Sequence, residues 1–209
     1  MNSEVTACLE EAIPDWRAGK LERHQFWVQN MLADPCLDCK LSQTRTNLVL
    51  YRGNPEARLM GIGEAPGKKE DLTGQVFVGQ AGELGDRMFA YMGLDPDRQV
   101  YLANIVKCRP PGNRDPEPDE VEACLPYLLG QIKLVQPQML MIMGKVAAVS
   151  LGLIPRNEPL TPYLGKWVEF QNIPTMIVYH PAFLLRNKLK RHDQALYLDR
   201  IVAYMQQQW

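Results

Sequence analysis

The sequence lacks any long apolar run that could span a membrane and any segment with the pattern of a secretory signal peptide. Cysteine is also scarce, with 5 among 209 residues, which is far below the density of disulfide-stapled secreted domains. These absences predict a chain that works in the reducing cytoplasm and has no membrane partner. Thiols in that compartment usually bind metals or stay free.

An excess of charge of one sign is missing too. The chain has 23 basic and 24 acidic residues and a formal net charge of −1, so net charge neither favours nor excludes a polyanionic partner. The distribution is uneven, because residues 1–38 hold seven acidic and three basic side chains and the rest of the chain holds 17 and 20. Two basic runs, KCRPPGNR at 107–114 and LLRNKLKRH at 184–192, are candidates for phosphate contact, although such runs are more often solvated faces.

Four of the five cysteines have a spacing that fits one metal site. Cys36 and Cys39 form a C-x₂-C pair, fifteen residues lie between Cys108 and Cys124, and sixty-eight residues separate the two pairs. A whole βα stretch must fold before the four thiolates converge, so the site would join the beginning of the chain to its middle. Zinc and an iron–sulfur cluster both take soft thiolate ligands, and the spacing does not decide between them. Four unrelated buried thiols are the alternative, and Cys8 has no assigned role.

Four short apolar stretches without polar alternation are typical of strands covered on both faces. They span residues 58–62, 100–106, 138–143 and 175–179, and segments with apolar residues at helical spacing span 81–92, 119–135 and 145–151. Strand alternating with helix predicts one α/β domain whose parallel sheet has helices on both faces. With 46% hydrophobic residues, the chain can bury one core of that size.

Ligands of parallel α/β folds bind beyond the carboxyl ends of the strands, and this rule selects candidate residues without reference to function. The residues that follow the predicted strands, and that we expect to face one crevice, are Glu64, Asp71, Asn104, Gly144, Lys145 and His180. Of the three histidines, His180 alone follows a strand, directly before a proline that suits a helix start. His24 and His192 have polar neighbours and are expected on the surface.

The first strand continues into the glycine-rich segment GIGEAPGKKEDLTGQVFVGQAG, which we expect to be a long loop that other backbone can approach closely. It matches neither the G-x-x-x-x-G-K-[ST] phosphate loop nor the G-x-G-x-x-G dinucleotide motif in the required register, so an ordinary nucleotide-binding site is excluded. Phe77 is the one aromatic residue of this segment. It is a candidate ligand contact, although an aromatic residue in such a position more often caps the core.

Three motifs, GEAPGKKEDLTGQVFVGQAG, YLANIVKCRPPGNRDPEPDE and YHPAFLLRN, together with the cysteine spacing, resemble the family 4 uracil-DNA glycosylases over residues 36–187. The resemblance implies a three-layer α/β/α fold with a central four-stranded parallel sheet, and a [4Fe–4S] cluster on Cys36, Cys39, Cys108 and Cys124. It also implies a monomeric DNA repair enzyme associated with the nucleoid. Such an enzyme flips uracil out of single- or double-stranded DNA and hydrolyses its glycosidic bond, which leaves an abasic site.

The resemblance assigns roles inside the site as well. It implies that Phe77 stacks on the flipped base, that Asn104 binds its pairing edge, and that His180 donates a hydrogen bond to O2, where negative charge develops. Backbone N–H groups of Glu64 and Ala65 are expected to support this binding.

A carboxylate is expected to orient the attacking water and to favour the cationic sugar. The candidates are Glu64, Glu70 and Asp71, and we expect Asp71 to act while one of the glutamates supports it. Glu64 and Pro66 are expected to crowd the methyl group of thymine, because only a steric clash refuses one extra methyl group strongly.

DNA contacts are expected in the segment that follows the His180 motif. The basic residues predicted to meet phosphates beside the flipped nucleotide are Arg186, Lys188, Lys190 and Arg191, together with Lys145 after the third strand. Leu184 or Leu185 is predicted to fill the vacated place in the base stack. A position in the helix core is the alternative for both leucines.

Two features depart from the family pattern. An acidic extension over residues 1–35, which includes Trp16 and Trp27, precedes the single domain predicted over residues 36–209. We expect the extension to be helical and docked on the core. Val76 stands where many members have proline, and it could loosen the neighbouring Phe77.

Two other classes of protein remain open. A uracil-DNA binding protein without turnover would keep Phe77 and Asn104 but lack a competent carboxylate, and a zinc-stapled partner-binding module would release no base. A related branch that binds uracil DNA covalently has a glutamine in place of Ala65 and a basic insertion near the third cysteine. Both are missing here, which favours hydrolysis.

Overall fold

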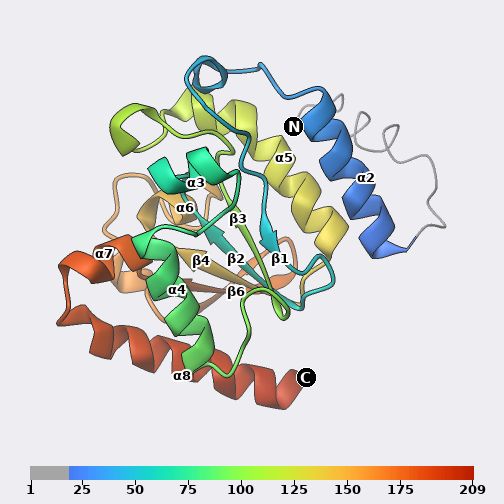
Figure 1. Ribbon diagram of the computed structural model, residues 1–209. Helices are drawn as coiled ribbons and strands as arrows, with labels where there is room; N and C mark the ends of the chain where they lie inside the picture. Colours follow the sequence, from blue (N-terminus) through green and yellow to red (C-terminus); the bar gives the residue numbers. More distant parts are fainter. Residues whose placement is uncertain (1–18) are drawn as a thin grey trace.

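The computed structural model describes residues 19–209, so Cys8 and Trp16 lie outside the described part (Figure 1). Six strands form one mixed sheet in the order β1-β3-β2-β4-β6-β5. The strands are β1 (Arg52–Gly53), β2 (Leu59–Gly63), β3 (Val100–Asn104), β4 (Met139–Met143), β5 (Trp167–Phe170) and β6 (Ile173–Val178).

The four central strands are parallel, as predicted. β2 lies between β3 and β4, with Gly63 opposite Asn104, and β6 continues the sheet beyond β4. Every residue of β2, β3 and β4 is buried, because helices cover both faces of the sheet. The four apolar stretches of the sequence are thereby confirmed as strands.

The sheet has six strands rather than the four expected. β1 pairs antiparallel with β3 at one edge, and β5 pairs antiparallel with β6 at the other. β1 is only two residues long, and β5 alternates exposed with half-buried residues. Neither strand therefore has the continuous apolar run that marks a strand buried on both faces.

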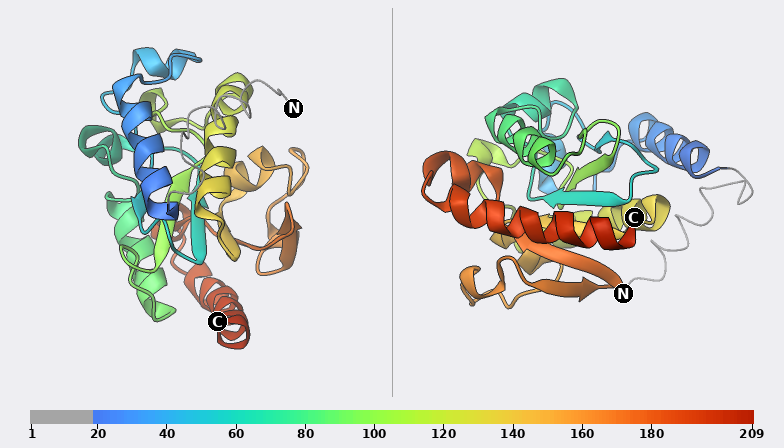
Figure 2. Two further views of the ribbon diagram at one scale, coloured as in Figure 1. Left: turned by 90° about the vertical axis from the view of Figure 1, so that its right-hand side faces the viewer. Right: turned by 90° about the horizontal axis from the view of Figure 1, so that it is seen from below.

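Helices form the two outer layers of the predicted α/β/α arrangement. α2, α5 and α6 lie on one face of the sheet, and α4, α7 and α8 lie on the other (Figure 1 and Figure 2). None of the described helices is both long and apolar enough to cross a membrane. The bounds are α2 (Lys20–Ala33), α3 (Lys68–Thr73), α4 (Gln80–Tyr91), α5 (Pro118–Val135), α6 (Lys145–Ser150), α7 (Pro181–Arg186) and α8 (Lys190–Gln208), with 3₁₀ turns at Lys40–Gln43, Pro111–Asn113 and Thr161–Tyr163.

The three helices predicted from apolar spacing are confirmed as α4, α5 and α6. α5 begins at Pro118, because proline suits the first turn of a helix and the Glu120 carboxylate accepts the Glu117 N–H at 2.8 Å. It ends where Gln136 takes a left-handed conformation with φ of 46°. The helix start predicted after His180 is also confirmed, since α7 begins at Pro181.

The glycine-rich segment is not one long loop. Residues Lys68–Thr73 form α3, and Gly74 ends this helix with φ of 73° before the chain passes Phe77 and enters α4. A helix of six residues is too short to show a helical period, so the apolar pattern did not reveal it. α3 decides which of its neighbouring side chains face the cavity described below.

Helix α2, which lies in the described part of the N-terminal extension, packs on the core. Trp27 and His24 are 3% and 0% exposed, because residues three apart share one face of a helix. The expectation that His24 lies on the surface is therefore wrong: its Nε2 atom lies 2.8 Å from the Tyr101 hydroxyl. His192 is exposed, as expected.

Candidate functional site

A cavity of about 590 Å³ opens beyond the carboxyl ends of β2, β3 and β6, where the strand-end rule places a ligand. Its wall includes seven of the predicted site residues, which are Glu64, Ala65, Glu70, Phe77, Asn104, His180 and Arg186. The segment from the end of β2 through α3 to the start of α4, the end of β3, and α7 with the residue before it carry them. The structure thus brings together residues that are far apart in the sequence.

Asn104 ends β3 at the floor of this cavity and is 2% exposed. Its side-chain Oδ1 atom is buried and has no hydrogen-bond partner among residues 19–209. An unpaired buried acceptor costs roughly 1–3 kcal/mol, so this atom is suited to accept a hydrogen bond from a ligand. Gly63 makes room for it, because a Cβ atom there would lie 2.6 Å from Oδ1 and 2.5 Å from the Phe77 ring.

Phe77 presents an aromatic ring beside the amide of Asn104. Its backbone is left-handed, with φ of 55°, a conformation that is uncommon for residues other than glycine. The ring is 7% exposed and its centroid lies 5.9 Å from that of the His180 ring. The two rings are inclined at 33°, and both line the cavity.

His180 is the N-cap residue of α7, and its Nδ1 atom accepts a hydrogen bond from the Ala182 N–H at 3.1 Å. Burial, assisted by the positive charge of Arg186, lowers the pKa of His180 to about 4. The imidazole is therefore neutral at neutral pH, and because Nδ1 is an acceptor, Nε2 carries the proton. The site thus holds a neutral hydrogen-bond donor on the cavity wall.

Glu64 and Glu70 both line the cavity but have different partners. Burial and then the negative charge of Asp115 raise the pKa of Glu64 to about 7, so this carboxyl changes charge near neutral pH. Glu70 is 8% exposed, and its Oε1 atom accepts the N–H groups of Val78 and Gly79 at 3.0 and 2.7 Å. Glu70 is thereby committed to holding the backbone that follows Phe77.

The expectation that Asp71 faces the crevice is wrong. Its carboxylate accepts the backbone N–H groups of Thr46 and Asn47 at 2.8 and 3.3 Å, and among the described residues it does not line the cavity. Successive residues of a helix point about 100° apart, so in α3 Glu70 faces the cavity and Asp71 faces away. Asp71 anchors the segment that leads into the core.

The loop after β3 supplies a wall that the sequence did not predict. Asn113, Arg114 and Asp115 line the cavity. The sequence placed Arg114 only in a basic run. The strand-end rule could have found this wall if it had been extended along the whole loop after β3 rather than to the first polar residue.

The predicted DNA contacts do not form one group. Arg186 lies at the cavity wall, whereas Lys145 lines a neighbouring groove of about 520 Å³ that shares Asp115 with the cavity. Lys190 pairs with Asp193 at 2.9 Å, and the Nε atom of Arg191 donates to the carbonyl of Leu184 at 3.2 Å. Lys188 is exposed in the turn between α7 and α8.

The prediction that Leu184 fills the base stack is wrong. This side chain is 1% exposed and belongs to the core, as the alternative foresaw, and Leu185 is half-buried. The helix α7 packs against α4, and Leu184 lines a shallow groove together with Leu84 and Met88 of α4. Leu189 is instead 94% exposed, between the cations Lys188 and Lys190.

Cys36, Cys39, Cys108 and Cys124 all line one second pocket. The first two lie between α2 and the 3₁₀ turn at Lys40–Gln43, the third follows β3, and the fourth lies in α5. The convergence expected from the spacing is thus present. Residues 19–209 contain no group of three His, Cys, Asp or Glu side chains placed to hold one metal ion, so the four thiols surround a space rather than meet at a point.

The surroundings of the thiols suit sulfur atoms that carry negative charge. Arg45 Nη1 donates to the Cys108 sulfur at 3.3 Å, and the Lys107 N–H donates to the Cys124 sulfur at 3.2 Å. Burial raises the pKa of Cys124 to about 12, against the effect of Lys107. A buried thiolate at neutral pH therefore needs a bound cation, and the donor set fits a group of thiolate-ligated metal ions.

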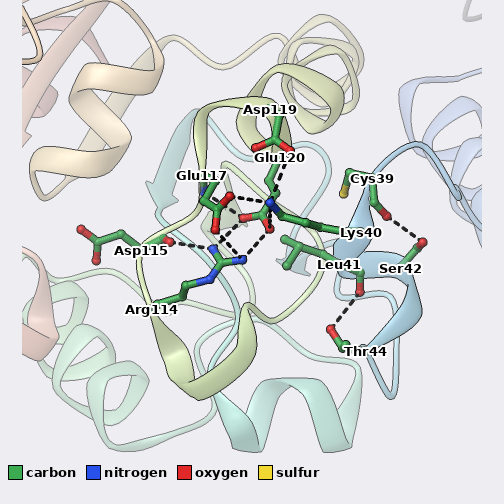
Figure 3. Close-up of polar contacts among 10 residues, drawn as sticks. All are labelled: Cys39, Lys40, Leu41, Ser42, Thr44, Arg114, Asp115, Glu117, Asp119 and Glu120. Atoms are coloured by element: carbon green, nitrogen blue, oxygen red, sulfur yellow. Dashed lines mark hydrogen bonds and ion pairs between the residues drawn. The ribbon is translucent and has the colours of Figure 1, made fainter.

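An ion-pair network connects the thiol pocket to the cavity wall (Figure 3). Lys40, next to Cys39, pairs with Glu117 and lies 3.5 Å from Asp119. Arg114 donates both Nη atoms to the fully buried Glu120 carboxylate at 2.8 and 2.6 Å, which lowers the pKa of Glu120. The network joins the segment of the first thiol pair to the start of α5 and to the loop that carries Asp115.

Comparisons with known proteins agree with the geometry. A family model of the uracil DNA glycosylase superfamily matches residues 50–206. A type-4 uracil-DNA glycosylase of Archaeoglobus fulgidus is 39% identical over 76% of this chain and 82% of its own length. A type-4 uracil-DNA glycosylase of Sulfurisphaera tokodaii is 42% identical over 73% of this chain and 72% of its own length. One of Thermotoga maritima is 38% identical over 73% of this chain and 79% of its own length. The chain therefore belongs to the uracil-DNA glycosylase superfamily and, within it, to the type-4 family.

Proposed function

We propose that this chain is a DNA repair glycosylase that binds uracil flipped out of DNA and hydrolyses its N-glycosidic bond, leaving an abasic site. The observation that carries the proposal is the buried, unpaired Oδ1 atom of Asn104 in a cavity that Phe77 and His180 also line. A flat base that enters this space finds a stacking surface, an amide and a neutral donor. The type-4 relatives support the same substrate.

Recognition rests on the amide of Asn104. Its Oδ1 atom accepts the N3–H group of uracil and its NH₂ group donates to O4. Cytosine offers an acceptor at N3 and a donor at the exocyclic amine, so the same amide orientation faces two mismatched groups. A site built around buried polar groups refuses such an analogue strongly, because its own groups are left unpaired.

Bond breaking places negative charge on the departing base and positive charge on the sugar. The Nε2–H group of His180 donates to O2, where the negative charge grows. A neutral donor serves this role, because its hydrogen bond strengthens as charge develops. The loss of one such donor typically lowers the rate by ~10²–10³-fold.

Water attack is assigned to Glu64 rather than to Asp71. Glu64 lines the cavity and has a pKa of about 7, so its carboxylate orients a water molecule and also favours the cationic sugar. Glu70 supports the site by holding the N–H groups of Val78 and Gly79. Asp71 has no access to the cavity in the described structure.

DNA is held on the exposed turn between α7 and α8. The cations that meet the phosphates are Arg186 at the end of α7, Lys188 in the turn, and Lys190 and Arg191 at the start of α8. The exposed side chain of Leu189 fills the vacated stack. Leu189→Ala should weaken the excision of uracil from duplex DNA more than from single strands, where no stack must be kept open. Equal losses on both substrates would remove Leu189 from this role.

The four thiolates are proposed to hold a [4Fe–4S] cluster. The cluster supplies a covalent link among three chain segments that are distant in sequence. A single zinc ion requires four sulfur atoms about 2.3 Å from one point, whereas the four thiols surround a space. The steps at the base, which are recognition, bond breaking and water attack, are performed by Asn104, His180 and Glu64.

An oligonucleotide that contains one uracil tests the proposed function. After incubation with the protein and treatment with alkali, strand breakage at the uracil position is expected, because alkali cleaves abasic sites. A retarded but intact strand would instead indicate a uracil-DNA binding protein without turnover. An adduct that resists denaturation would indicate covalent capture.

A further inference from the structure

The backbone of Phe77 needs support from outside the cavity. Its left-handed φ of 55° is unfavourable for a side chain with a Cβ atom. Such conformations persist only when neighbouring groups fix them. The residue before it, Val76, is fully buried and thereby fixed in the core.

Two side chains hold the peptide groups around Phe77. Arg52 Nη1 donates to the Phe77 carbonyl oxygen at 2.9 Å. On the following side, the Glu70 carboxylate accepts the N–H groups of Val78 and Gly79. Phe77 is thus held between a cation bonded to its own carbonyl group and an anion bonded to the next two amides.

Arg52 is itself fixed in place by two carboxylates. Its guanidinium group donates to Asp86 of α4 at 3.0 Å and to Asp97 at 2.7 Å, and its side chain is 14% exposed. The short strand β1 positions its backbone, and Gly53 is required there because a Cβ atom would lie 2.1 Å from the Val100 carbonyl oxygen. Arg52 therefore joins the edge of the sheet, α4 and the Phe77 loop.

We propose that Arg52 is a positioning residue for uracil excision, which fixes the Phe77 backbone so that the ring stands ready to stack on the flipped base. This inference rests on the proposed function. Among the described residues Arg52 does not line the cavity, so it acts through Phe77 rather than on the base. The planar guanidinium is suited to the task because its fork of N–H groups donates through two nitrogen atoms to each of Asp86 and Asp97 and also to the Phe77 carbonyl oxygen, whereas a lysine has one nitrogen atom with three N–H groups.

The test is a double-mutant cycle between Arg52→Met and Phe77→Leu, read by single-turnover release of uracil. Arg52→Met alone should lower the rate by about tenfold. In the Phe77→Leu background, where the ring is already missing, it should change the rate by less than about twofold. Arg98→Met is the matched control, because it makes the same substitution at an exposed arginine that precedes β3 and leaves the bond between Arg52 and Phe77 in place.

Binding of free uracil, measured by calorimetry, separates this inference from the proposed catalysis. Arg52→Met and Arg52→Lys should both bind uracil about tenfold more weakly than wild type, and Arg98→Met should bind it as wild type does. Arg52→Lys keeps the charge and serves if Arg52→Met does not fold. The role of Arg52 would be overturned if Arg52→Met bound uracil as tightly as wild type does. It would also be overturned if Arg52→Met lowered the rate by the same factor in the Phe77→Leu background as in wild type. If the Arg52 variants bound uracil more weakly but the wild-type protein released no base, only the proposed catalysis would be refuted.

Discussion

His180 shows how a backbone contact decides the chemistry of one side chain. Because its Nδ1 atom caps α7, the other ring nitrogen must carry the proton, and burial keeps the ring neutral. A neutral donor suffices for this role, because its hydrogen bond to O2 strengthens as negative charge develops on the base. The fold thus sets the tautomer, the charge and the position of this group together.

Asn104 should act on binding and on the rate, because it meets the pairing edge in the ground state and in the transition state. Asn104→Ala is expected to lower single-turnover release and to reduce the preference for uracil-containing over unmodified DNA in binding by about tenfold. Fluorescence anisotropy with matched oligonucleotides measures that preference. An unchanged preference would show that another group reads the base.

Glu64 should give the reaction its pH dependence. Its pKa is raised to about 7, so the carboxylate that orients water forms as pH rises, and the single-turnover rate should increase through about pH 7 and then level. Asp115→Asn removes the negative charge that raises this pKa, so its midpoint should lie at lower pH. Glu64→Gln should have a low single-turnover rate that does not increase with pH through this range. A rate that falls as pH rises through 7 would contradict the assignment.

At the scale of elements, the sequence predicted the strands and helices that have a continuous apolar run or a regular apolar spacing. The buried central strands and the helices α4, α5 and α6 have the apolar runs and spacing that burial demands. β1 and α3 were missed because two and six residues are too few to show a period. Both matter to the site, since β1 carries Arg52 and the turn of α3 separates Glu70 from Asp71.

The orientation of side chains on short helices was the least predictable part of the site. Asp71 was assigned from its place after a strand and Leu184 from its place after the His180 motif, but the phase of a helix decides which neighbour faces the cavity. His24 was misjudged for a related reason, because its buried face becomes visible only when α2 is docked. Asn104 and His180 were predicted more readily, since the strand ends of a parallel sheet meet at one edge, and Phe77 was singled out as the one aromatic residue of its segment.

The docking of α2 should weaken in acid. Burial lowers the pKa of His24 to about 4, whereas an unfolded chain protonates histidine near about 6.5. The unfolded state therefore binds more protons between these values, and the free energy of unfolding should fall as pH drops from about 6.5 to about 4. Urea unfolding at several pH values measures this.

His24→Gln is the control for that prediction. It should be less stable than wild type at pH 7 but lose less stability on acidification, because one of the two buried histidines no longer takes up a proton. Parallel curves for the two proteins would show that His24 does not carry the effect.

At the scale of the whole molecule, the thiol pocket and the cavity share one supporting frame. Lys107 lies between Cys108 and β3, and its buried Nζ atom donates to the carbonyl oxygen of Asn104 at 2.6 Å. On the other side, Glu120 and Arg114 join α5 to the loop that carries Asp115 (Figure 3). Order in the thiol pocket is thereby coupled to the shape of the uracil site.

Loss of one thiol ligand should therefore affect the fold as a whole. Anaerobically purified protein is expected to be brown and to contain about four irons per chain. Cys108→Ala should lose the iron and unfold at a lower temperature, whereas Cys8→Ala should keep both properties. Stoichiometric zinc without iron, in protein produced with ample iron, would contradict the cluster assignment.

The most direct test of the account compares His180→Ala with wild type in single-turnover release of uracil and in equilibrium binding of uracil-containing DNA. The donor acts on charge that appears as the bond breaks, so the rate should fall by ~10²-fold or more while DNA affinity changes little. Release of uracil by His180→Ala at the wild-type rate would contradict the account, because it would show that the catalytic site does not lie in this cavity.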